Sequence, residues 1–448
     1  MKTLIKDASI VNEGRIFVGS ILIEDGKIAR IFEGTANEYQ NENTAVISAK
    51  GKYVLPGLID DQVHFREPGL THKGNIYSES RAAVAGGITS FMEMPNTVPQ
   101  TTTLALLEDK FDIAAQNSIA NYSFFIGATN DNTDVLIDAD PTITAGIKIF
   151  MGSSTGNMLV DNHEVLNNIF SKAKMLIATH CEDEQTIKNN LAQYQAKYGD
   201  NIPFEMHHLI RSEEACYKSS SFAVALAKKH NTRLHILHIS SASEVELFDN
   251  SMPLSQKRIT SEACTHHLWF SDADYLEKDR WIKWNPSVKT AKDRDAVWEG
   301  VLNNKIDIIA TDHAPHSLEE KQGPYLKAPS GGPLVQHALP AMLQMVKQGR
   351  ISLERAVEKL CHAPALCFQI HQRGFIREGY HADLVMVDLN DPWTVDKSNI
   401  LYHCGWSPFE GTTFDAKVIT TWVNGSIVYK NGSVVENGAM GQQIRFAR

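Results

Sequence analysis

The feature that most constrains the fold is a regular alternation between about Tyr53 and about Ile370. Short β-branched runs there alternate with longer helix-like segments, which is typical of βα units wound around a parallel sheet. The candidate strands are Val54–His64, Thr89–Met94, Gly146–Phe150, Met175–His180, Leu234–His238, Arg258–Cys264 and Ile306–Thr311. The pattern predicts an α/β fold, a (β/α)8 TIM-like barrel over residues 53–370.

Both ends of the chain have a different texture. Short alternating segments such as Ser20–Glu24 near the start and Val418–Val423 near the end are separated by turn signals, for example Asn424-Gly and Asn431-Gly. Because the two ends are alike, we expect residues 1–52 and 371–448 to form one smaller β-sandwich module beside the barrel.

Charge and composition exclude several classes of partner. The chain of 448 residues has 43 Lys and Arg against 53 Asp and Glu, a net charge of −10, so it offers no global attraction for nucleic acid or anionic lipid. No run approaches the ~18 apolar residues of a membrane helix, and no signal-like segment opens the chain. With six cysteines and no C-x-x-C pair, we expect a cytoplasmic protein with reduced thiols.

Several candidate strands end in a polar residue that could serve chemistry. These residues are His64, His180, His238 and Asp312. Because the carboxyl ends of the strands of a (β/α)8 barrel surround one point, the four side chains should be neighbours. Three imidazoles and a carboxylate form a set that binds zinc and leaves room for a water, so the sequence predicts a metal site there.

Lys148 lies in an apolar strand, where an unpaired cation is strongly disfavoured. Three interpretations stay open: a Schiff-base amine, as in an aldolase; a carbamate formed with CO2 that bridges metal ions; or an ammonium group that reaches the barrel rim. Gln62, His64 and Arg66 alternate along one strand, so their side chains should share one face.

A serine-hydrolase motif competes with the metal interpretation. Gly152-Ser-Ser-Thr-Gly156 fits G-x-S-x-G after a strand, and Asp312 and His316 follow later as possible partners. This alternative leaves Lys148, His180 and His238 without a role, so the metal site is favoured.

Three longer motifs identify a family resemblance. They are His64-Phe-Arg-Glu-Pro-Gly69, Gly86-Gly-Ile-Thr-Ser-Phe-Met-Glu-Met-Pro-Asn-Thr97 and Thr311-Asp-His-Ala-Pro-His316. With them, nearly the whole chain resembles the cyclic amidohydrolases, and within these the class I dihydroorotases. Allantoinases and hydantoinases share the metal ligands but usually lack the arginine found here as Arg66.

The resemblance implies a zinc-dependent hydrolase that reversibly interconverts N-carbamoyl-L-aspartate and L-dihydroorotate in pyrimidine biosynthesis. Asp312 would be the catalytic proton carrier between the attacking water and the ring nitrogen. The small anionic substrate would be bound through its carboxylate, and a homodimer is plausible from the family. The implied metal ligands are His64 and Asp312 for one zinc, His180 and His238 for a second, and carbamylated Lys148 between them; the implied substrate contacts are Arg66, Asn96, His316 and, near the ring, Asn285.

Two departures from the family pattern qualify these expectations. Gln62 stands where the family has a histidine, and a neutral amide is a poorer zinc ligand, so we predict one tightly held zinc and a second that is weaker or absent. The loop 328–337 ends in Gln336-His337, which indicates either simple divergence or altered ring specificity or loop closure. A hydantoinase-like or allantoinase-like enzyme, and a catalytically silent homologue that serves as a structural partner, therefore stay open as alternatives.

Overall fold

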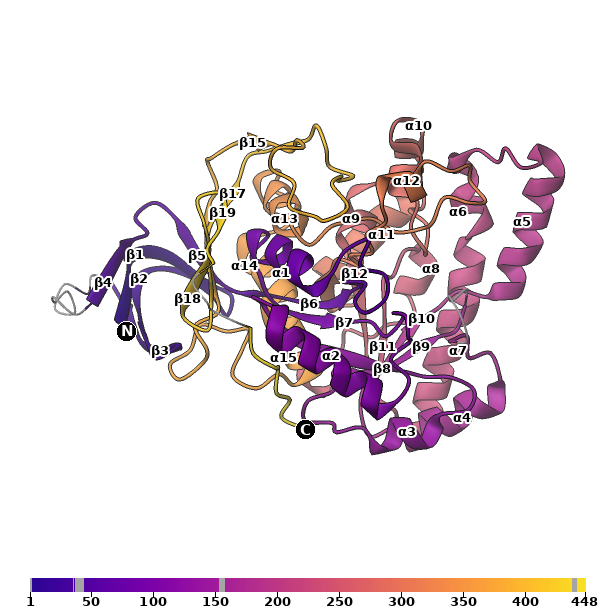
Figure 1. The fold of residues 1–448 in the computed structure, drawn as a ribbon, viewed down its shortest axis with the longest axis horizontal. Coiled ribbons are helices and arrows are strands. Elements are labelled where there is room, and N and C mark those ends of the chain that lie inside the picture. The colour runs from indigo at the N-terminus through magenta and orange to yellow at the C-terminus, as the bar shows by residue number, and fades with distance from the viewer. Residues whose placement is uncertain (1, 35, 37–43, 153–157, 437–440) are drawn as a thin grey trace.

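The structure is a computed structural model that describes residues 2–34, 36, 44–152, 158–436 and 441–448. It consists of a barrel and, beside it, a β-sheet built from both ends of the chain (Figure 1). The predicted fold class is confirmed. The competing motif at residues 152–156 falls almost entirely outside the described residues.

Eight parallel strands form the barrel. The sheet order follows the chain from β6 to β13, and the ends meet because Val63 pairs with His313 and the His64 amide donates to the His313 carbonyl at 2.7 Å. The strands are β6 (Leu58–Val63), β7 (Ile88–Glu93), β8 (Asn121–Gly127), β9 (Gly146–Phe150), β10 (Ile177–His180), β11 (Leu234–Ile236), β12 (Ile259–Cys264) and β13 (Ile308–Ala310).

Helices surround the barrel, and several begin at side chains that cap free backbone amides. Thr103 accepts from the Leu106 amide, and Ser212 accepts from the Ala215 amide. The helices are α1 (Ile76–Ala85), α2 (Leu104–Asn117), α3 (Thr133–Asp138), α4 (His163–Lys172), α5 (Glu184–Tyr198), α6 (His207–Ile210), α7 (Glu213–His230), α8 (Ala242–Val245), α9 (Thr265–Trp269), α10 (Tyr275–Lys278), α11 (Ala291–Leu302), α12 (Leu318–Lys321), α13 (Ala338–Lys347), α14 (Leu353–Val357) and α15 (Ala363–Phe368). Short helical turns complete them: η2 (Phe204–Met206), η3 (Leu254–Gln256), η4 (Asp272–Asp274), η5 (Asp279–Ile282) and η6 (Glu358–His362).

The two ends of the chain join in one nine-stranded sheet. Its N-terminal and C-terminal parts meet where β5 pairs with β14, and apolar side chains such as Ile10 and Trp422 fill its core. The strands are β1 (Lys2–Asn12), β2 (Arg15–Glu24), β3 (Lys27–Glu33), β4 (Thr44–Ser48), β5 (Tyr53–Pro56), β14 (Leu384–Asp388), β17 (Lys417–Val423), β18 (Ser426–Lys430) and β19 (Ser433–Val434). A separate pair consists of β15 (Trp393–Thr394) and β16 (Thr413–Phe414).

Two strands differ from the sequence prediction. The segment Val54–His64 is two strands, because the chain leaves the terminal sheet at Gly57, whose amide donates to Asp383 and where a Cβ would lie 2.1 Å from Thr89 Oγ1. The sequence also missed β8, in which polar Asn121 and Ser123 interrupt the apolar pattern. Both side chains are buried and hydrogen-bonded, which is what permits them in a buried strand.

The last residues of the chain lie against the N-terminal end of the barrel. The Ile444 amide donates to the Tyr122 carbonyl, and the side chains of Ile444 and Phe446 are buried there.

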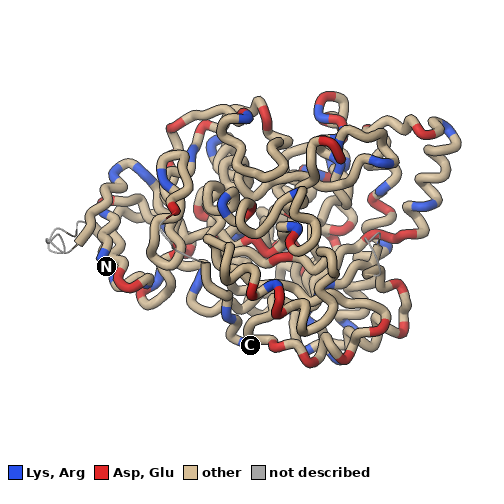
Figure 2. Tube along the Cα trace, in the orientation of Figure 1, with Lys and Arg blue, Asp and Glu red and all other residues tan. Residues whose placement is uncertain are grey.

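All six cysteines are buried and free. Charges of both signs are spread along the whole trace (Figure 2). Among the described helices, none has the length and apolarity needed to cross a membrane.

Candidate active site

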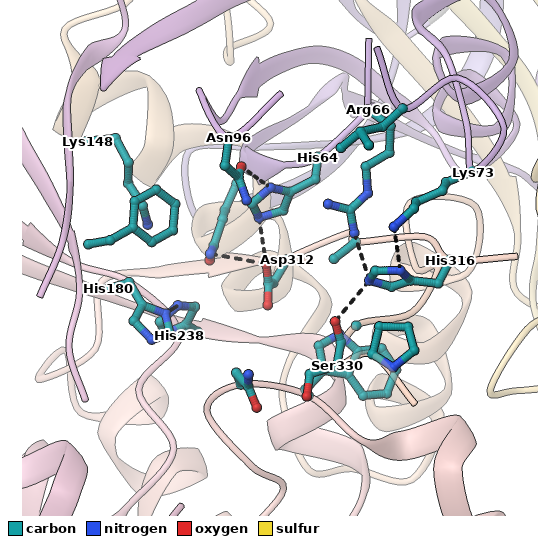
Figure 3. A pocket seen from close by; sticks show the side chains of 18 residues that line it. His64, Arg66, Lys73, Asn96, Lys148, His180, His238, Asp312, His316 and Ser330 are labelled. Atoms are coloured by element: carbon teal, nitrogen blue, oxygen red, sulfur yellow. Dashed lines mark hydrogen bonds and ion pairs between the residues drawn. The ribbon is translucent and has the colours of Figure 1, made fainter. Parts of the chain in front are cut away.

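One cavity of about 320 Å³ lies at the carboxyl ends of the barrel strands. Its walls include every site residue predicted from the sequence, although these residues come from seven separate parts of the chain (Figure 3). Those residues are His64, Arg66, Asn96, Lys148, His180, His238, Asn285, Asp312 and His316, and Gln62 lies among them. Barrel topology therefore brings together residues that lie as far apart in the chain as Gln62 and His316.

The histidine pair, His180 and His238, forms one side of the cavity. His180 Nδ1 lies 3.0 Å from His238 Nε2, while His180 Nε2 donates to Glu182 at 3.0 Å. Glu182 also binds Arg211; burial acts to raise the Glu182 pKa, but Arg211 and His180 outweigh it and lower this pKa to about 2. The carboxylate therefore fixes the His180 tautomer and directs the Nδ1 lone pair into the cavity.

The aspartate cluster, Gln62, His64 and Asp312, forms the opposite side. His64 Nδ1 lies 2.7 Å from Asn96 Oδ1 and donates to it, so the His64 Nε2 lone pair faces Asp312 Oδ1 at 3.2 Å. Gln62 Nε2 donates to the same carboxylate oxygen at 3.2 Å, and Gln62 Oε1 accepts from Cys264. Gln62 thus presents its NH2 group, not its carbonyl oxygen, to Asp312.

Lys148 enters the cavity from β9 with 1% of its surface exposed. Its Nζ lies 4.6 Å from the centre of the Phe150 ring, and in the described part of the chain no hydrogen bond or ion pair reaches it. Burial lowers the pKa of Lys148 to about 8, with Asp312 acting in the opposite direction. With this pKa roughly a tenth of the amine is neutral at pH 7, and the neutral amine is the form that attacks CO2 or a carbonyl.

The backbone is strained at three of these positions. Arg66, His238 and Asp312 have φ values of 71°, 42° and 49°, in the left-handed region that non-glycine residues seldom occupy. Such conformations persist where the surrounding structure enforces them, and they cluster at functional sites. Burial also raises the pKa of Asp312 to about 7, so its carboxyl group can gain or lose a proton near neutral pH.

Arg66, His316 and Asn285 line the cavity beside the aspartate cluster. The Arg66 guanidinium donates to the Pro315 carbonyl at 3.0 Å and lies 3.2 Å from His316 Nε2, so neither partner is anionic. Burial, together with Arg66, lowers the pKa of His316 well below its ordinary value. Asn285 Oδ1 is buried without a hydrogen-bond partner in the described residues, so an amide oxygen is free to bind a ligand.

Comparison with known proteins identifies the family. A model described as "Amidohydrolase family" matches residues 53–428. The chain belongs to the amidohydrolase family. The dihydroorotase of Pyrococcus abyssi is 33% identical over 424 residues, covering 94% of each chain, and that of Lactobacillus acidophilus is 30% identical over 443 residues, covering 97% of this chain and 100% of the relative. These matches make the chain a metal-dependent hydrolase of cyclic amides.

Solved structures agree with this family. An L-hydantoinase (dihydropyrimidinase) from Arthrobacter aurescens superposes on this amidohydrolase with a TM-score of 0.93, 28% identity and 99% coverage of both chains. A dihydropyrimidinase from Brevibacillus agri superposes with a TM-score of 0.88 at 23% identity over 100% of both chains, a likeness of fold alone.

The divergent loop of this amidohydrolase meets the cavity at one end only. Pro329, Ser330 and Gly331 line the cavity, whereas the Gln336 side chain binds the Asn399 carbonyl at 2.7 Å and the Leu401 amide at 2.8 Å. His337 lies 3.0 Å from both Tyr402 and Ser407. The unusual Gln336-His337 pair therefore fastens the 399–407 segment outside the cavity.

Several contributors to the amidohydrolase site were missed from the sequence. Lys73 lines the cavity and lies 3.2 Å from His316, and Glu182 with Arg211 orients His180. Only Glu182 carried a local signal, a carboxylate two positions after a strand-end histidine. Two further buried groups could hold a cation by the proximity of their ligand atoms: Cys264 with His266 and His267, and Asp61 with His235 and Glu262.

Proposed function

We propose that this amidohydrolase is a dihydroorotase that reversibly interconverts N-carbamoyl-L-aspartate and L-dihydroorotate in pyrimidine biosynthesis. The observation that carries the proposal is Arg66. It is 94% buried in the cavity, and both of its hydrogen-bonding partners are uncharged, so its positive charge is available to a ligand. A guanidinium fork matches a planar carboxylate, the group that dihydroorotate has and hydantoin lacks.

The residues of the cavity fit a bound zinc ion on each side. In the aspartate cluster the lone pair of His64 faces a carboxylate oxygen, an arrangement that a cation between them makes favourable. The possible ligand atoms lie 3.0 Å apart in the histidine pair and 3.2 Å apart between His64 and Asp312, so each pair of atoms could hold one ion together. Lys148 would join the two sides as a carbamate, because its amine is buried with a lowered pKa and has no anionic contact among the described residues.

The zinc ions would differ in affinity. Since Gln62 directs its NH2 group at Asp312, the aspartate cluster lacks one imidazole ligand, whereas the histidine pair is complete. We expect one zinc to survive dialysis against a mild chelator and the second to be labile or absent. Metal analysis that finds two zinc ions per chain after such dialysis would contradict this expectation.

The protein residues divide the chemistry among them. When bound, zinc supplies Lewis acidity and lowers the pKa of a water toward ~7. Arg66, Asn96 and His316 would hold the substrate carboxylate, and Asn285 would orient the ring. Asp312 would accept the proton of the attacking water and deliver it to the ring nitrogen, a role that suits a carboxyl group with a pKa of about 7. The reverse transfer serves ring closure.

A second candidate is a hydantoinase. It is favoured by the superposition on the Arthrobacter aurescens L-hydantoinase at a TM-score of 0.93. The two candidates differ in whether the substrate carries a carboxylate, so Arg66 discriminates between them.

The test is turnover of purified protein with zinc and bicarbonate present. Dihydroorotate and carbamoyl-aspartate are followed beside hydantoin and allantoin, with Asp312→Asn as the inactive control, expected to lose at least ~10²-fold in kcat. For a dihydroorotase, Arg66→Gln raises the KM for dihydroorotate and leaves any slow hydantoin turnover unchanged. Absence of dihydroorotate turnover in the wild-type protein rejects the proposal, and turnover of no substrate supports a silent homologue.

A further inference from the structure

A second cavity lies at the opposite end of the barrel from the active site. It has a volume of about 470 Å³ and lies beside the N-terminal ends of β11 and β12, between η3, α15 and the segment 369–380. None of the residues that line the active-site cavity contributes to it. The proposed function assigns it no role.

Positive charge dominates this basal cavity. Among the described residues that line it, five side chains are cationic and none is Asp or Glu. The cations are Arg233, Lys257, Arg258, Arg373 and Arg377. The chain as a whole has a net charge of −10, so the positive charge of this lining is opposite in sign to the charge of the whole protein.

Three of the five cations have carboxylate partners behind the cavity wall. Lys257 pairs with Asp307 at 2.7 Å, Arg373 with Asp383, and Arg377 with Glu13. These three are accounted for by the fold, and they contribute little net charge to a ligand.

No carboxylate in the described part of the chain pairs with Arg233 or Arg258. Arg233 donates to Gln369 Oε1 at 2.5 Å and to the Cys367 carbonyl, and Arg258 donates to the Asn231 carbonyl at 2.8 Å, so all these acceptors are neutral. Burial lowers the pKa of Arg233, and the nearby charge of Arg258 acts in the same direction. Two guanidinium groups that line the same cavity repel each other, and an anion that binds between them stabilises both.

The surroundings add a third guanidinium and further donors. Arg448 donates only to backbone carbonyls, among them Phe368, and its buried Nε has no partner in the described residues. Ser255, Gln256 and Thr260 also line the cavity, beside the aromatic rings of Phe375 and Tyr380. Hydroxyl, amide and guanidinium donors around an apolar wall suit a phosphate group attached to a small organic body.

We propose that the basal cavity is a binding site for a small phosphomonoester, whose phosphate lies between Arg233 and Arg258. A dianionic phosphate neutralises both guanidinium groups, whereas a single carboxylate would neutralise one. The site would act at a distance from the chemistry, because the barrel core separates it from Asp312.

The experiment is calorimetric titration of the zinc-loaded protein with AMP, inorganic phosphate and adenosine at constant ionic strength. We expect AMP and phosphate to bind and adenosine not to bind. In the double variant Arg233→Gln/Arg258→Gln the Kd for AMP should rise at least tenfold, while Arg258→Lys, which keeps the charge, should change it less than threefold. Arg294→Gln, which replaces a partly exposed arginine on α11 outside the basal cavity, is the matched control and should bind AMP like the wild type.

An active-site variant separates the two cavities. Arg66→Gln should leave AMP binding unchanged, because Arg66 does not line the basal cavity. The proposal is overturned if wild-type protein binds neither phosphate nor AMP, if the double variant binds AMP as tightly as the wild type, or if Arg66→Gln alone abolishes binding. If AMP binds no more tightly than inorganic phosphate, the ligand is identified as free phosphate. Because binding is measured without substrate, this result is independent of whether the enzyme turns over dihydroorotate.

Discussion

The two sides of the active-site cavity are built on different principles. In the histidine pair, an ion pair outside the cavity orients one imidazole: Glu182, held by Arg211, accepts from His180. Glu262 accepts only the backbone amide of His238 at 3.1 Å, and among the described residues nothing hydrogen-bonds to His238 Nδ1. In the aspartate cluster, Gln62 directs a hydrogen-bond donor at Asp312. The first side therefore presents an imidazole nitrogen of fixed orientation, whereas on the second side a protein amide satisfies the carboxylate.

This difference teaches that an amide at position 62 can satisfy the buried carboxylate of the site. The Gln62 amide satisfies Asp312 in the absence of an ion, so the carboxylate does not remain buried and unpaired. Under the proposed function, we expect the consequence of this amide to fall on metal affinity and not on folding. The following predictions test this contrast.

The largest effect is expected from Glu182→Gln. A neutral amide would no longer fix the His180 tautomer, so affinity for the tightly held zinc should fall ~10–100-fold, as for other outer partners of metal ligands. Zinc retention across a series of chelators measures it. The matched control is Asp183→Asn, which changes the neighbouring carboxylate. Asp183 caps α5, so this variant should retain zinc. Equal retention in Glu182→Gln and the wild type would contradict the asymmetry.

Gln62→His should make the two sides more alike. The variant supplies an imidazole and removes the NH2 group that binds Asp312. Affinity for the second zinc should therefore rise at least ~10-fold, which is the size of effect seen for residues that hydrogen-bond to metal ligands. Isothermal titration of zinc into partly loaded protein measures it. An unchanged titration would show that Gln62 is not what weakens this side.

Acid should weaken the two sides unequally. Because the pKa of Asp312 is raised to about 7, a metal at the aspartate cluster must displace a proton below that pH, and its affinity should fall ~10-fold per pH unit. The His238 pKa is lowered well below its ordinary value by burial and by His180, so this ligand is already neutral and adds little pH dependence. Zinc titrations at pH 6 and pH 7 measure how the affinity of each side depends on pH, and Asp312→Asn should remove the steeper pH dependence of the aspartate cluster. An equal loss of zinc affinity at both sides would contradict this prediction.

The smallest effect on catalysis is expected from Gln336→Ala. This variant loses the contacts to Asn399 and Leu401 outside the cavity and should lower the free energy of unfolding by about 1–3 kcal/mol. Its kcat/KM should stay within twofold of the wild type. A large change in kcat/KM at unchanged Tm would instead show that the divergent loop sets specificity.

Much of the cavity could be predicted from local signals. His64, His180, His238 and Asp312 stand at or just after strand ends, where barrel topology makes a site, and Lys148 is conspicuous as a cation in an apolar strand. β8 was missed because its polar residues are satisfied by tertiary hydrogen bonds that no local pattern reveals.

The sequence by itself determined the barrel, the sheet built from both termini and the residues that meet in the active site, because strand alternation and strand-end chemistry are local properties. Only the tertiary structure decided which way Gln62 presents its amide, that Glu182 and Arg211 lie behind His180, and that uncompensated arginines gather at the far end of the barrel. These features depend on the orientation of side chains whose partners lie tens to hundreds of residues away, and packing alone fixes that orientation.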